Sequence, residues 1–248
     1  MAYKTSNPGL NSKTFDGLPV PADLAQRMTL QGTVNKAYLM LFVLLMVAAW
    51  SWSQAVPPGG LAFVGANAMM GGIGGLILAL IIIFNKPLAV YLSLPYAACQ
   101  GLVLGGLSSV FEQRYPGIVI QSVGLTFGVL ASLLLAYTSR VIKVTQTFRL
   151  GVAAATGGIA LVYVASIVGG FFGYHLPIVY GSSTASIVFS LVVVAVAAFN
   201  LVLDFDFIES GVAHGAPKYM EWYAAFGLLV TLVWLYMEIL RLLSKRRR

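Results

Sequence analysis

The sequence predicts an all-α polytopic membrane protein with seven transmembrane helices, and three observations carry this prediction. First, 59% of the 248 residues are hydrophobic and only 9% are charged, whereas a soluble domain averages about 25% charged residues. Second, seven apolar runs follow one another along the chain. Third, these runs are continuously apolar and show no period of two, which excludes a membrane β-barrel.

The seven predicted spans are residues 37–53, 61–84, 88–111, 117–138, 148–172, 184–206 and 221–243. A helix needs about 20 residues to cross a bilayer, and the first run is slightly short. Short breaks force neighbouring spans to be antiparallel, so residues 36–243 are expected to form one bundle. Residues 1–35 are polar and predict a mostly irregular tail, and residues 244–248 predict a basic C-terminal tail.

Basic residues predict the orientation, because loops that stay in the cytoplasm are enriched in Lys and Arg. In a seven-span topology one side of the membrane holds Lys4, Lys13, Arg27, Lys36, Lys86, Arg140, Lys143, Arg149 and Lys218. Before the C-terminus the other side holds only Arg114. The N-terminus is therefore expected in the cytoplasm. A cluster from Arg241 to Arg248 argues against a complete last crossing, which the sequence leaves open.

The net charge of +7 is explained by this topology and does not indicate nucleic-acid binding, since the basic residues form no stripe interleaved with aromatic residues. No enzyme is predicted, because the chain shows no nucleophile–base pair, metal-ligand set or nucleotide loop. His175 and His214 lie in predicted loops without ligands at metal spacing, so no cofactor or resident metal is expected. The single Cys99 can form no internal disulfide.

Glycines four residues apart predict close helix packing in three spans. The pairs are Gly71 and Gly75, Gly101 and Gly105, and Gly124 and Gly128. This spacing places both glycines on one face of a helix, where the missing side chains let two backbones approach.

Three carboxylates lie inside apolar runs, and Asp204 and Glu238 are the candidate functional residues, whereas Asp206 faces another way, lies nearer the loop and is expected at most to support them. An ionised Asp at the centre of a membrane helix costs about 2.5–3.5 kcal/mol, so Asp204, Asp206 and Glu238 should face the bundle interior, water or a partner, or be protonated. Two carboxyl groups that meet tend to share a proton and titrate as a unit. Asn200 lies one turn before Asp204 and could hydrogen-bond to it, and Arg241 follows Glu238 by three residues.

Three stretches of the chain resemble the Bax inhibitor family, also called transmembrane Bax inhibitor motif proteins, in its bacterial branch. The stretches are Asn7-Pro8 with Lys13-Thr14-Phe15, residues 28–36, and residues 203–209 taken with 221–223 and 235–243. The resemblance covers essentially the whole chain. It implies six helices wrapped around a central C-terminal helix, and the bacterial branch implies a place in the cell (inner) membrane.

The same resemblance implies a pH-sensitive calcium leak gated by two carboxylates, Asp204 in the sixth helix and Glu238 in the seventh. Calcium or a proton would then be a transient or permeant ion rather than a cofactor. Some relatives are thought instead to be non-transporting regulators that bind a membrane partner such as a quality-control protease, and this alternative stays open.

Helix geometry separates the two predicted gating residues. Asp204 lies 11 residues before a turn near Gly215 and Glu238 lies 23 after it, an offset of about 18 Å at 1.5 Å per residue. Contact between them requires residues 218–223 to lie outside the core or the helix hairpin to bend.

Overall fold

The computed structural model describes residues 21, 23–55, 60–174 and 176–247, and among these it contains helices but no strand. The seven long helices are α1 (Leu30–Ser53), α2 (Gly60–Phe84), α3 (Ala89–Arg114), α4 (Ile118–Thr138), α5 (Gln146–Phe171), α7 (Thr184–Ala213) and α8 (Met220–Arg246). Three short elements are η2 (Leu24–Gln26), η3 (Lys86–Leu88) and α6 (Pro177–Tyr180). Residues 1–20 and 22 of the irregular tail predicted over residues 1–35 lie outside the described residues, as does His175, and residues 30–35 of that tail are helical.

All seven long helices are long and apolar enough to cross a membrane, which confirms the all-α membrane fold. Large apolar side chains such as Phe84, Ile120, Leu161 and Phe171 are between 72% and 85% exposed in the isolated protein. Exposure on this scale is expected when the surroundings are lipid rather than water. A lipid bilayer is therefore the environment of this chain.

Local capping residues determine where several helices begin. Thr29 accepts a hydrogen bond from the Gly32 amide, so α1 begins at Leu30, well before the predicted start at residue 37. Thr145 caps α5 in the same way, and Ser183 caps α7. A hydroxyl at this position satisfies one of the backbone amides that the first turn leaves unpaired.

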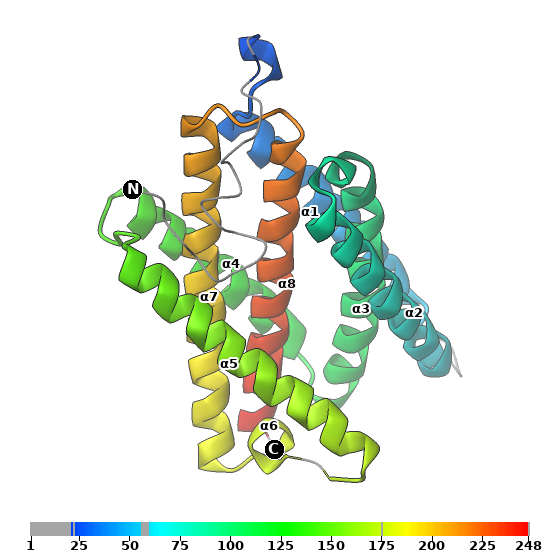
Figure 1. Cartoon of the computed structure of the whole chain (residues 1–248). Helices are drawn as coiled ribbons and strands as arrows, with labels where there is room; N and C mark the ends of the chain where they lie inside the picture. The colour runs from blue at the N-terminus through cyan, green and yellow to red at the C-terminus, as the bar shows by residue number, and fades with distance from the viewer. Residues whose placement is uncertain (1–20, 22, 56–59, 175, 248) are drawn as a thin grey trace.

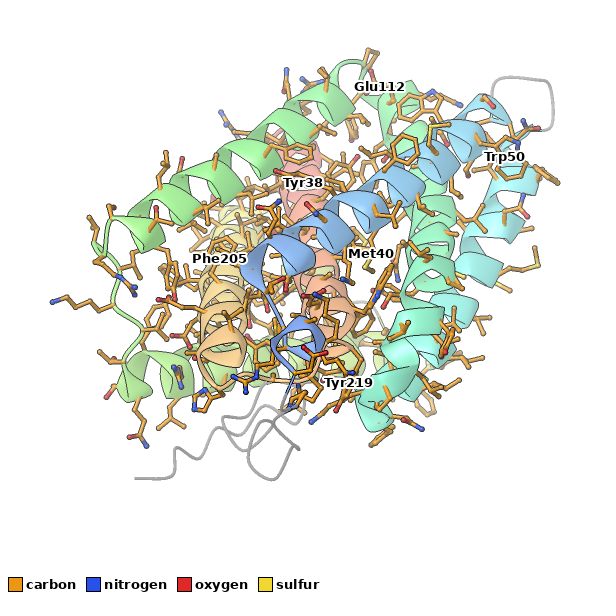
Figure 2. All side chains as sticks on the ribbon, turned by 90° about the horizontal axis from the view of Figure 1, so that it is seen from above. Tyr38, Met40, Trp50, Glu112, Phe205 and Tyr219 are labelled. Atoms are coloured by element: carbon orange, nitrogen blue, oxygen red, sulfur yellow. The ribbon has the colours of Figure 1, made fainter. Side chains whose placement is uncertain are left out.

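The C-terminal helix α8 lies at the centre of the bundle (Figures 1 and 2). It packs against α1, α3, α4 and α7, whereas α2 packs mainly on α3 and α5 mainly on α7. Leu235 and Leu240 of α8 are at most 2% exposed. The predicted central helix is confirmed, but four helices rather than six pack extensively against it, and α2 and α5 form an outer layer.

Successive long helices run in opposite directions, which defines two ends of the bundle. We call the end where α1, α3, α5 and α8 begin the Glu221 end, and the opposite end the Lys245 end. Helix α8 runs from one end of the bundle to the other, so it is long enough for a complete crossing and it ends opposite the start of α1 (Figure 1). Residues 244–246, expected in a tail, are the last turn of this helix.

The glycine prediction is confirmed for α2 and α3 and wrong for α4. A Cβ on Gly71 would lie 2.6 Å from the carbonyl oxygen of Cys99, and one on Gly101 would lie 2.7 Å from that of Leu44. Added Cβ atoms on Gly124 and Gly128 would have nothing within 4 Å. Spacing shows which glycines share a face, but it does not show whether another helix covers that face.

Candidate functional site

A line of polar side chains follows the contact between α5, α7 and α8 from one end of the bundle to the other. We call it the polar seam. Its members are Arg149, Thr156 and Tyr163 of α5, Ser186, Ser190, Asn200, Asp204 and Asp206 of α7, and Thr231, Glu238, Arg241 and Lys245 of α8. Helix α5 crosses α7 and α8 obliquely along this line (Figure 1).

Helical spacing explains why these residues can align. Arg149, Thr156 and Tyr163 recur every seven residues, which places them on one side of α5. Ser186 and Asp206 are 20 residues apart on α7, about 30 Å along a helix. The hydrocarbon core of a bilayer is also about 30 Å thick, so the polar seam is long enough to cross it.

Asp204 lies near the Glu221 end of the seam, two residues before Asp206, and has an unsatisfied oxygen. Its side chain is only 3% exposed, and its Oδ2 atom has no hydrogen-bond partner. The side chain that faces it from α8 is Thr231. Buried polar atoms are nearly always hydrogen-bonded, so a proton or a cation would satisfy an oxygen that the protein itself leaves open.

Glu238 is also buried, but both of its carboxylate oxygens accept hydrogen bonds. Tyr163 donates a hydrogen bond to Oε1 at 2.8 Å, and Arg241 Nη1 donates to both carboxylate oxygens at 2.8 and 3.0 Å. Arg241 also donates to the Tyr163 hydroxyl at 2.7 Å, and its guanidinium lies 5.2 Å from the ring centroid. The three side chains form a closed group in which the charge of Glu238 is neutralised.

The structure does not bring Asp204 and Glu238 into contact. Asp204 faces Thr231, and Glu238 follows Thr231 by seven residues, or about 10.5 Å along α8. This offset is smaller than the predicted 18 Å because α7 continues to Ala213 and α8 begins only at Met220. The hairpin formed by α7 and α8 does not bend enough to bring the two carboxylates together.

The two other predicted supporting residues pair with α5. Asn200 Nδ2 donates to Thr156 Oγ1 at 2.8 Å and to the Val196 carbonyl at 2.9 Å, so it does not contact Asp204 as predicted. Asp206 forms an ion pair of 2.5 Å with Arg149. Both residues therefore hold α5 against α7.

A pocket of about 370 Å³ opens beside Asp206 at the Glu221 end of the seam. Its lining includes Tyr137, Arg140, Lys143, Asp206 and Glu209. Arg140 Nη2 lies 2.6 Å from Glu209 Oε1, and this hydrogen bond raises the pKa of the Arg140 guanidinium. Tyr137 also donates to Glu209. The pocket gives water and ions access to the first ion pair of the seam.

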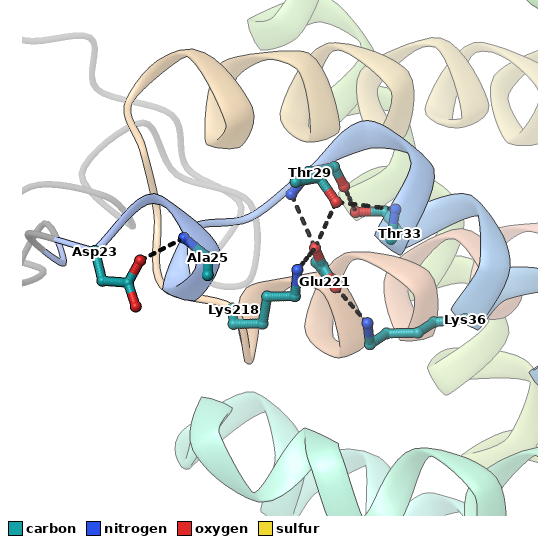
Figure 3. Close-up of polar contacts among 8 residues, drawn as sticks. Asp23, Ala25, Thr29, Thr33, Lys36, Lys218 and Glu221 are labelled. Atoms are coloured by element: carbon teal, nitrogen blue, oxygen red, sulfur yellow. Dashed lines mark hydrogen bonds and ion pairs between the residues drawn. The ribbon is translucent and has the colours of Figure 1, made fainter.

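Glu221, at the start of α8, is a buried carboxylate that the sequence analysis did not single out. Its side chain is fully buried, its Oε1 accepts from the amide and hydroxyl of Thr29 at 2.9 and 2.8 Å, and it pairs with Lys36 and, at 3.4 Å, with Lys218 (Figure 3). These contacts tie the start of α1 to the start of α8. Lys36 is 185 residues away along the chain, so no local pattern could have revealed the pair.

Lys245 is the second residue that sequence reasoning missed. It was assigned to the basic tail, but it is 5% exposed and its Nζ donates to Ser190 Oγ at 2.8 Å. The seven-residue spacing from Glu238 was the available signal, because it places both residues on the same side of α8. In the part of the chain that the structure describes, no three His, Cys, Asp or Glu side chains are grouped to hold a metal ion.

Comparison with known proteins agrees with the membrane fold. A family model described as Bax inhibitor 1 like matches residues 4–248, essentially the whole chain. No curated protein matches the chain, and no solved structure matches it.

Proposed function

The chain belongs to the Bax inhibitor 1 like family, and from this premise we propose that it is a pH-sensitive cation leak, with calcium as the permeant ion and Asp204 as its gate. The observation that carries the proposal is the buried, unpartnered Oδ2 of Asp204 in the polar seam. Acidic side chains select cations in membrane pores, and ionisable residues inside membrane segments commonly mark ion pathways.

Among the two predicted gating residues, Asp204 is assigned the pH response. Arg241 pairs with Glu238 and Tyr163 hydrogen-bonds to it, so its negative charge is already balanced. Asp204 Oδ2 has no hydrogen-bond partner, so protonation of Asp204 changes the charge of the seam directly. We assign Glu238 to positioning α5 against α8. The proposed setting is the cell (inner) membrane with the N-terminus in the cytoplasm, as the distribution of basic residues predicts.

The test is calcium flux into liposomes that contain the purified protein, measured across a pH series with Asp204→Asn beside the wild type. We expect wild-type flux to rise with pH, because ionised Asp204 attracts cations, and Asp204→Asn to stay at the low-pH level throughout. Asp23→Asn is the matched control, since Asp23 is an exposed carboxylate outside both the seam and the pocket, and it should keep the wild-type profile. Equal flux and pH dependence in Asp204→Asn and the wild type would refute the proposal.

A further inference from the structure

At the Lys245 end, the polar seam finishes at a buried ammonium group. Lys245 Nζ donates to Ser190 Oγ at 2.8 Å and to the Ser186 carbonyl oxygen at 3.3 Å. Ser186 is held in place by its own hydroxyl, which donates to the carbonyl oxygens of Ile178 and Gly181 at 2.8 Å each. The short helix α6 therefore supports the oxygens that receive the lysine.

These oxygens are the kind that bind an inorganic cation. Backbone carbonyls replace the hydration shell of ions in selectivity filters, and hard cations are bound by oxygen atoms. A lysine ammonium is a compact point charge with rotatable donors, so it can occupy a position that an inorganic cation would otherwise take. Ser186 and Ser190 are at most 1% exposed, which removes bulk water as a competitor.

The position of Lys245 places it across the proposed route. Ser190 precedes Asp204 by 14 residues on α7, about 21 Å along the helix axis. Lys245 follows Arg241 by four residues on α8 and so lies on the same side of that helix. A cation that leaves Asp204 and follows α7 toward the Lys245 end would reach the oxygens to which the ammonium is bound.

We propose that Ser186 and Ser190 form a cation site at the Lys245 end of the polar seam, and that Lys245 occupies this site as a tethered plug. This inference rests on the proposed leak function. In addition to the gate at Asp204, Lys245 closes the ion path at a second point. The last turn of α8 is held by Arg247, whose Nη1 donates to the Pro116 carbonyl at 2.8 Å and whose Nη2 donates to Gln121 Oε1 at 3.0 Å. Helix ends open at low free-energy cost, so release of this turn withdraws the plug.

The first test is calcium flux in liposomes with Lys245→Met, which keeps the length of the side chain and removes the charge. We expect a rise of roughly tenfold, corresponding to a barrier lowered by about 1.4 kcal/mol. Arg246→Met removes the neighbouring exposed charge and should leave flux at the wild-type level. Wild-type flux in Lys245→Met, while Asp204→Asn still alters flux, would overturn the plug and leave the leak intact. Absence of flux in every variant would overturn the leak itself.

The second test does not depend on flux. In a Cys99→Ala background, Ser190→Cys introduces a single thiol at the proposed site, and a cationic thiosulfonate reagent is applied from the Lys245 end. Arg247→Ala releases the end of α8 without altering Lys245, and it should raise the labelling rate of Cys at this position, as should Lys245→Met. Unchanged labelling in a folded Arg247→Ala variant would overturn the plug even where Lys245→Met does not fold.

Discussion

The two sides of the bundle use different contacts to hold their helices together. On one side, α1, α2 and α3 approach through glycines, so that Gly71 and Gly101 lie against backbone carbonyls of the neighbouring helix. On the other side, α5, α7 and α8 meet through hydrogen bonds and ion pairs, among them Asn200 with Thr156 and Asp206 with Arg149.

This difference separates a sealed region from one that can carry charge. Backbones in close van der Waals contact leave no room for an ion, and close approach through small residues is a common means of helix association in lipid. A polar contact can exchange its partners for water, a proton or a cation. The α5–α7–α8 side is therefore where we place the ion path, and the α1–α2–α3 side acts as its rigid support.

The largest effect is expected where the two sides are joined, at Glu221. Glu221→Gln leaves Lys36 without its buried counter-charge and weakens the hydrogen bonds from Thr29. Breaking a buried ion pair costs about 3–5 kcal/mol, so we expect destabilisation near 3 kcal/mol, measured as thermal unfolding in detergent. Lys36→Met combined with Glu221→Gln should recover part of the loss. Wild-type stability of Glu221→Gln would show that α1 does not depend on this contact.

A smaller loss is expected from filling a glycine contact on the sealed side. In Gly101→Ala the new methyl group would lie 2.7 Å from the Leu44 carbonyl oxygen and 2.8 Å from Val47 Cβ, so α1 and α3 must separate. Overpacking costs about 1–3 kcal/mol. Gly128→Ala is the control, because its methyl group meets no atom within 4 Å and Ala is the better helix former. Equal unfolding temperatures for the two variants would show that the contact of Gly101 with α1 does not contribute to stability.

The smallest loss is expected at the ion pair between α5 and α7. Asp206 and Arg149 side chains are 21% and 22% exposed, so Asp206→Asn should cost only about 1 kcal/mol, less than a fully buried pair. A double-mutant cycle with Arg149→Met should show that the two effects are not additive. Glu209→Gln provides the comparison, because its partner Arg140 is 67% exposed and no measurable change is expected. Additive effects of Asp206→Asn and Arg149→Met would show that this pair does not hold the seam together.

Much of the candidate site could be read from residue type and helical period. Asp204 stands out as an acid in an apolar run, Arg241 is one turn from Glu238, and helix rise predicts that Asp204 and Glu238 are offset along the hairpin, although it overestimates the distance. The direction in which Asn200 points could not be obtained in this way. It has Asp204 one turn away on its own helix, yet it donates to Thr156 of α5, because the rotation of α7 about its axis is set by the helices that pack against it.

By itself the sequence determined the seven apolar helices, their alternation and the carboxylates inside them, since these depend on composition, period and the thickness of a bilayer. The tertiary structure alone decided which of those groups have partners. It buried Glu221 against Lys36, left an oxygen of Asp204 unsatisfied and placed Lys245 on Ser190. The physical reason is that a hydrogen bond or ion pair depends on the register and rotation of two helices, and residues distant along the chain determine both.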